Sequence, residues 1–159
     1  GSAFTFFSLA EVYLVNANEF ARHVSQIHYL DADVVDASSL PEAIIKLMIL
    51  NQDKSSLVGI KEEIKRWEVE CAFSLPYALE VNPPGITKAR TLKSLLKAMQ
   101  FDGLPVYTLG DGENDLPLFK LSQRSFAPST VHPAILESAD LILQREKDGI
   151  LAPVLEKIQ

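Results

Sequence analysis

Apolar positions in the first half of the chain follow two different periods. Short apolar or β-branched runs predict strands, whereas the spacing of Leu57, Ile60 and Ile64 predicts one face of a helix. The predicted elements are strand 11–15, helix 18–26, strand 42–50, helix 55–67, and strands 69–73 and 77–81. This half therefore reads as a small sheet with helices, an α+β lobe.

The strongest break in the pattern is Asn-Pro-Pro-Gly at residues 82–85, because proline fixes φ and keeps the preceding residue out of a helix. We place a lobe boundary there, between residues 1–80 and residues 81–159. Short buried strands then alternate with helices, which predicts parallel βαβ units of a doubly wound α/β sheet. The predicted order is helix 87–100, strand 106–109, helix 114–121, strand 125–127, helix 133–138, strand 141–143 and helix 150–158.

Composition narrows the classes of function. The 159 residues suffice for one domain or for two small lobes. No apolar run approaches the roughly 18 residues that a membrane span needs, so we expect no membrane partner. The net charge of −6 removes the basic surface that nucleic-acid binding usually requires, so we expect no nucleic-acid partner either.

The cysteine count and the first residues bear on the origin of the chain. The single Cys71 has no partner for an internal disulfide and no zinc-ligand spacing, so we interpret it as a small apolar residue of a cytoplasmic protein. The chain begins Gly1-Ser2 rather than with methionine, which is typical of a remnant of tag cleavage. We therefore expect that the natural protein begins upstream.

Residues 110–115 read Gly-Asp-Gly-Glu-Asn-Asp and directly follow the predicted strand 106–109. In parallel sheets, ligands bind beyond the carboxyl ends of strands, which is where Asp111 falls. Carboxylates on a short loop suit Mg²⁺, which takes one or two of them and completes its shell with water and phosphate oxygens. The alternative is a solvated acidic helix N-terminus with Asn114 as its N-cap.

Lys88 favours the first interpretation. It opens a helix, where a positive charge opposes the helix dipole unless the side chain faces an anion. Taken alone, Lys88 is better interpreted as a solvated surface lysine. Together with a carboxylate turn at a neighbouring strand end, it supplies the two charges that hold a phosphate with its metal.

These motifs resemble a known family. GITKARTL, then GDGENDLPLF with Asp111 lying 23 residues after Lys88, then SFAPSTVHPAILESADLIL and DGI, are similar to the C-terminal part of the haloacid dehalogenase (HAD) superfamily, in its Cof-type sugar-phosphatase branch. The similarity covers residues 79–154. The first half resembles the α/β cap of that branch more loosely. The resemblance implies an α/β fold: a HAD-like, Rossmannoid partial core with an α+β cap lobe that sets substrate specificity.

The resemblance also implies an activity, the Mg²⁺-dependent hydrolysis of small phosphorylated metabolites through an aspartyl-phosphate. Lys88 would be catalytic, neutralising the phosphate and the nucleophile. Asp111 would ligate Mg²⁺ directly and Asp115 would support the metal shell. Asn114 would orient the loop or touch phosphate. One departure is Thr130, which stands where relatives commonly carry the asparagine of an Asn-Ala pair.

In members of the family, the nucleophile lies in a DxD motif near the start of their chains. Asp31-Ala32-Asp33 matches it superficially, but the preceding residues are too polar for a central buried strand. We interpret this segment as a solvated turn of the cap, and the neighbouring His23 and His28 as surface or half-buried residues without a metal role.

We therefore expect that the chain lacks the nucleophile and is inactive alone. It is either a piece of a complete phosphatase or a naturally shortened, noncatalytic binding domain. Strand 106–109 would then keep an unpaired edge and an uncovered apolar face. We predict either self-association of the chain through this edge or a rearranged core.

Overall fold

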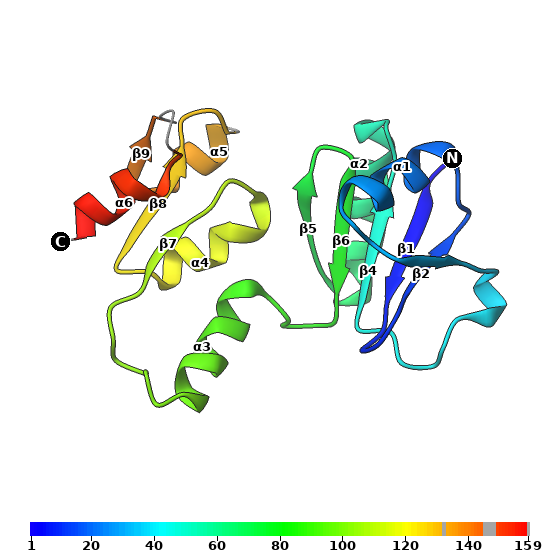
Figure 1. Cartoon of the computed structure of the whole chain (residues 1–159), viewed down its shortest axis with the longest axis horizontal. Helices are drawn as coiled ribbons and strands as arrows, with labels where there is room; N and C mark the ends of the chain where they lie inside the picture. Colours follow the sequence, from blue (N-terminus) through cyan, green and yellow to red (C-terminus); the bar gives the residue numbers. More distant parts are fainter. Residues whose placement is uncertain (132, 145–148, 159) are drawn as a thin grey trace. The chain divides into compact units, whose positions relative to one another are not determined.

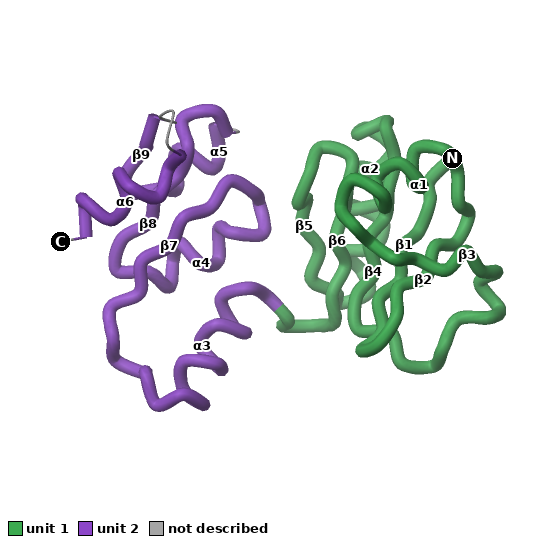
Figure 2. Tube along the Cα trace, in the orientation of Figure 1, with its two compact units in different colours: residues 1–86 green, residues 87–159 purple. Residues whose placement is uncertain are grey.

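The computed structural model describes residues 1–131, 133–144 and 149–158. The chain divides into two compact units, Gly1–Ile86 and Thr87–Gln159 (Figure 2). The division lies beyond residue 80 because strand β6 (Ala78–Asn82) crosses that point and pairs within the first unit.

Unit 1 contains a six-stranded sheet in the order β3-β2-β1-β4-β6-β5 (Figure 1; β3 is labelled in Figure 2). It is an α+β arrangement, as the sequence predicts. Its other elements are β1 (Ala3–Phe7), β2 (Val12–Val15), α1 (Glu19–Ile27), β3 (Ala32–Val34), η1 (Ala37–Ser39), β4 (Lys46–Leu50), α2 (Lys54–Ile64), η2 (Lys65–Trp67) and β5 (Glu70–Leu75).

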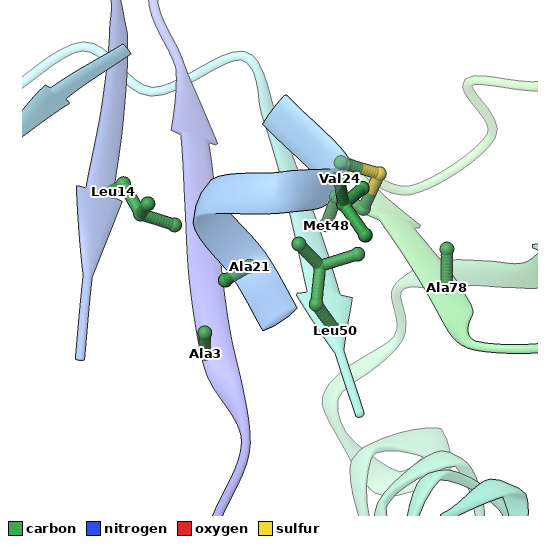
Figure 3. Close-up of a cluster of buried hydrophobic side chains, with 7 residues drawn as sticks. All are labelled: Ala3, Leu14, Ala21, Val24, Met48, Leu50 and Ala78. Atoms are coloured by element: carbon green, nitrogen blue, oxygen red, sulfur yellow. The ribbon is translucent and has the colours of Figure 1, made fainter. Parts of the chain in front are cut away.

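The two helices of unit 1 pack on opposite faces of this sheet. Four strands run in the same direction: β2, β3, β4 and β5. Helix α1 connects β2 to β3, toward one edge of the sheet, whereas α2 connects β4 to β5, toward the other edge. Because such crossovers are right-handed, two crossovers toward opposite edges place their helices on opposite faces. The side chains agree: Leu50 packs with Ala21 and Val24 of α1 (Figure 3), whereas the adjacent Ile49 packs with Leu57 of α2.

Three sequence predictions in unit 1 need correction. The pattern missed β1, which is a central strand. Strand β4 begins at Lys46 rather than at residue 42, because its partner β1 ends at Phe7, opposite Lys46. The Asp31–Asp33 segment is not a turn, since Ala32–Val34 forms an edge strand parallel to β2. Both aspartates are exposed, as edge positions allow. His23 and His28 are also exposed, which confirms their predicted place on the surface.

The segment between the units is held at its unit 1 end. Gly85 adopts a φ of 70°, a conformation that favours glycine, and its amide donates to Glu70 Oε1 at 3.0 Å. The amide of Ile86 donates to the carbonyl of Pro83 at 3.1 Å. The chain therefore leaves β6 through a hydrogen-bonded turn that is fixed to β5.

Unit 2 is a parallel α/β unit, as predicted, with its strands in the order β7-β8-β9. Helices α4 and α5 pack on one face of the sheet with Ala127, and α6 packs on the other with Phe126. Its elements are α3 (Lys88–Ala98), β7 (Tyr107–Leu109), η3 (Glu113–Asp115), α4 (Leu116–Leu121), β8 (Arg124–Pro128), α5 (Pro133–Leu136), β9 (Leu141–Leu143) and α6 (Leu151–Ile158).

Strand β7 has a free edge. It pairs with β8 on one side, and no strand in the described ranges pairs with its other side. A run of apolar side chains leading to this strand is also uncovered; it comprises Leu95, Met99, Phe101, Leu104 and Tyr107, each between 37% and 59% exposed. The predicted free edge is therefore confirmed within unit 2.

No helix in the part of the chain that the structure describes combines the length and the hydropathy that crossing a membrane would require.

Candidate active site

Lys88 is fixed by the start of α3. Thr87 caps this helix in an extended conformation, and its hydroxyl accepts from the amide of Arg90 at 3.2 Å. Lys88 is the first helical residue, and its Nζ lies 2.6 Å from Asp115 Oδ1. The lysine side chain is 49% exposed and the aspartate side chain 7%. An almost buried carboxylate therefore holds a cation that remains accessible to solvent.

Asp115 also closes the turn that follows β7. Its Oδ2 accepts from the backbone amides of Asp111 and Gly112, each at 3.1 Å. The Asp115 amide in turn donates to the Gly112 carbonyl at 3.0 Å. A side chain on Gly110 would not fit, because its Cβ would lie 2.5 Å from Asp115 Cβ. Glycine at residue 110 is what allows the aspartate to reach back over the turn.

The carboxylates of this turn have different surroundings. Both oxygens of Asp115 have partners within the protein, whereas Asp111 is exposed at the carboxyl end of β7. Asn114 is half-buried and packs over the turn, since a Cβ on Gly112 would come within 2.8 Å of its Oδ1. Asp111 is thus the carboxylate that faces water beside a fixed lysine–aspartate pair.

This arrangement fits Mg²⁺ better than a metal enclosed by side chains. Among the described residues, no group of three or more histidine, cysteine, aspartate or glutamate side chains is placed to hold a metal ion. Mg²⁺ needs no such group, because it binds through one or two carboxylates and keeps water and phosphate oxygens as its other ligands. Asp111 would be the direct ligand, and Asp115 would hold the loop behind it.

The predicted site residues gather within unit 2. Lys88 contacts Asp115 directly, Asp111 joins them through its backbone amide, and Asn114 lies in the same turn. The amides of Asp111 and Gly112 were missed as partners of Asp115. The signal that could have revealed them is a glycine-flanked aspartate followed four residues later by a second aspartate.

Asp140, another aspartate of unit 2, has a structural role. Asp140 Oδ2 accepts from the amide and the hydroxyl of Ser125, each at 2.7 Å, at the amino-terminal edge of the sheet. These hydrogen bonds, with a smaller contribution from Arg124, lower the pKa of Asp140. Its carboxylate ties β9 to β8 and lies at the edge opposite to the Asp111 turn.

The family model of the haloacid dehalogenase-like hydrolases matches residues 2–155. The chain belongs to this family. It is 30% identical over 121 residues to a phosphoglycolate phosphatase of Sulfurisphaera tokodaii, which covers 76% of the chain and 50% of that relative. The chain therefore spans about half the length of this relative.

Solved structures share the fold. A haloacid dehalogenase-like hydrolase from Bacteroides thetaiotaomicron superposes with a TM-score of 0.72 at 22% identity, covering 99% of this chain and 61% of that one. A HAD subclass IIB sugar phosphatase superposes with a TM-score of 0.80 at 17% identity, with the same coverage. The HAD-like fold inferred from the sequence is therefore confirmed.

Proposed function

We propose that this HAD-family chain carries the phosphate- and metal-binding half of a Mg²⁺-dependent phosphatase that acts on small phosphorylated metabolites. The observation behind the proposal is the Lys88–Asp115 pair, which anchors the amides of the Asp111 turn at the carboxyl end of β7. It leaves a cation and a carboxylate exposed at a loop where α/β sheets bind their ligands.

The roles of the side chains follow from their contacts. Lys88 would bind the phosphoryl oxygens with its remaining N–H donors, since Asp115 occupies one of the three. Asp115 would keep the Lys88 ammonium and the Asp111 turn in fixed positions, and Asn114 would restrict the turn from above. Mg²⁺ bound at Asp111 would supply stabilisation of the negative charge that develops during phosphoryl transfer.

We propose that neither Asp31 nor Asp33 is the nucleophile of this reaction. Both are exposed at or beside the edge strand β3, not at the end of a buried central strand. We propose that the whole protein forms an aspartyl-phosphate on a residue outside this chain, and that the 159 residues bind phosphate without hydrolysing it. A naturally noncatalytic binding domain is the alternative.

The substrate class is proposed from the relatives. One is named as a phosphatase of phosphoglycolate and one as a sugar phosphatase, so we propose small phosphorylated acids or sugars as substrates. Unit 1 would act as the cap that sets specificity. Cytoplasmic localisation remains a prediction.

Titration of the ¹⁵N-labelled chain with Mg²⁺ and inorganic phosphate tests the proposal. We expect phosphate to shift the amide resonances of Asp111 and Gly112 only when Mg²⁺ is present. A chain that carries Asp111→Asn should lose this response. A noncatalytic domain with an unused acidic turn predicts no metal-dependent shift in either protein. For the whole protein, hydrolysis of an aryl phosphate that survives Asp111→Ala would refute the proposed metal role.

We also propose that the chain self-associates through the free edge of β7. The edge exposes backbone donors and acceptors beside uncovered apolar side chains, and Tyr107–Leu109 contains no charged residue to discourage pairing. Sedimentation velocity should show a concentration-dependent dimer that Tyr107→Lys reduces. Ile142→Lys, at another exposed apolar position, on β9, is the control and should leave the dimer intact. A chain that stays monomeric at millimolar concentration would contradict this proposal.

A further inference from the structure

The carboxyl ends of the three parallel strands of unit 2 leave the sheet at one edge. The β7–β8 ladder continues past Leu109, since the Gly110 amide donates to the Phe126 carbonyl at 3.1 Å. The β8–β9 ladder continues likewise, with the Ser129 amide donating to the Leu143 carbonyl at 2.9 Å. Neighbouring strands lie about 4.8 Å apart. The segment that follows β8 therefore starts beside the Asp111 turn.

The start of this segment is fixed by side chains. The hydroxyl of Ser129 donates to Gln144 Oε1 at 3.0 Å, which ties the residue after β8 to the residue after β9. Thr130 follows directly and is exposed. A hydroxyl-bearing side chain thus leaves a pinned backbone at the same edge as the exposed carboxylate of Asp111.

The two edges of the sheet differ in how their polar groups are used. At the amino-terminal edge, Ser125 is 1% exposed and its hydroxyl is bonded to Asp140. These bonds hold the strands together, and the buried Ser125 hydroxyl is closed to a ligand. At the carboxyl edge, the hydrogen bond between Ser129 and Gln144 ties the ends of β8 and β9 together, and Thr130 is exposed to solvent.

Resting on the proposed function, we infer that Thr130 is a ligand-binding residue whose hydroxyl donates to an oxygen of the phosphorylated ligand held at the Asp111 turn. Ser129 and Gln144 are positioning residues, which keep Thr130 at the edge of the site. The ligand class is a phosphate monoester, because Lys88 and the metal at Asp111 bind its charged end and leave further oxygens to be contacted by a neutral donor.

The test compares three variants of the 159-residue chain by NMR titration with inorganic phosphate, and separately with glycerol 3-phosphate, in the presence of Mg²⁺. We expect the ligands to shift the amides of Ser129 and Thr130 together with those of Asp111 and Gly112. Thr130→Val should weaken binding about three- to tenfold, the effect of one lost hydrogen bond. Thr130→Ser should restore it. Thr91→Val, which removes an exposed hydroxyl on α3, is the matched control and should have no effect.

The outcomes separate the two proposals. Shifts at Asp111 and Gly112 alone, with Thr130→Val binding as tightly as the parent chain, would overturn the role of Thr130 and leave the phosphate site standing. The absence of Mg²⁺-dependent shifts throughout unit 2 would overturn both. A loss of affinity that Thr130→Ser does not restore would point to altered packing of the segment and would also contradict the inference.

Discussion

Replacing Lys88 with methionine is expected to destabilise unit 2 and to abolish its binding of phosphate. Methionine keeps an unbranched side chain of nearly the same length but leaves Asp115 Oδ1, on a residue only 5% exposed, without its cation. Loss of a hydrogen bond between charged groups costs about 1–3 kcal/mol, and the half-exposed lysine favours the lower part of that range. Urea unfolding followed through amide resonances measures the effect in each unit separately.

Lys93→Met is the matched control, because Lys93 is an exposed residue of the same helix. It should leave both the unfolding midpoint and the phosphate response of unit 2 unchanged. The amide resonances of unit 1 provide a second control, since Lys88 bonds to Asp115 in unit 2. Equal unfolding midpoints for the two methionine variants would show that the lysine–aspartate pair contributes nothing to the turn.

Asp111 and Asp115 are expected to respond in opposite ways to the same substitution. Asp111→Asn should change the free energy of unfolding by less than about 0.5 kcal/mol, because Asp111 is exposed, but should remove Mg²⁺ binding. Asp115→Asn should destabilise unit 2 by about 1–3 kcal/mol. The side-chain NH₂ of the new asparagine must face either the Lys88 ammonium or the two backbone N–H groups. In either orientation a donor faces a donor, and the hydrogen bond at that position is lost.

Urea unfolding and Mg²⁺ titration of the two asparagine variants provide the measurement. The expected pattern is a stable Asp111 variant that does not bind metal and an unstable Asp115 variant. If Asp111→Asn instead destabilises unit 2 while Asp115→Asn does not, the division between ligand and supporting residue is reversed.

The alternating pattern of the second half predicted the strands and helices that the structure describes in unit 2, because short buried strands and amphipathic helices have distinct periods. Unit 1 was harder. The run Ala3–Phe7 stands at the beginning of the chain, without a preceding turn to bound it, and both of its faces are covered. Edge strand β3 was hidden because an exposed edge tolerates Asp33, which breaks the apolar pattern.

The residue types of the candidate site could be predicted, but their hydrogen bonds could not. Charge and position singled out Lys88 and Asp111, and the family resemblance implied the roles of Asn114 and Asp115. The sequence could not show that Asp115 uses both oxygens within the protein while Asp111 stays exposed, since this depends on the backbone path of the turn. The pairing of Ser129 with Gln144 depends in the same way on the register between β8 and β9.

The central position of β1 has a consequence for how the two units fold. Ala3 pairs with Leu50 and Phe4 with Ile49, 47 and 45 residues apart, whereas the strand pairings of unit 2 join residues only 15 to 17 apart. Contacts between distant residues slow folding, because the intervening loop must close before they form. During synthesis, β1 therefore cannot pair with β4 until β4 has left the ribosome. On refolding from denaturant, unit 2 should be the faster unit.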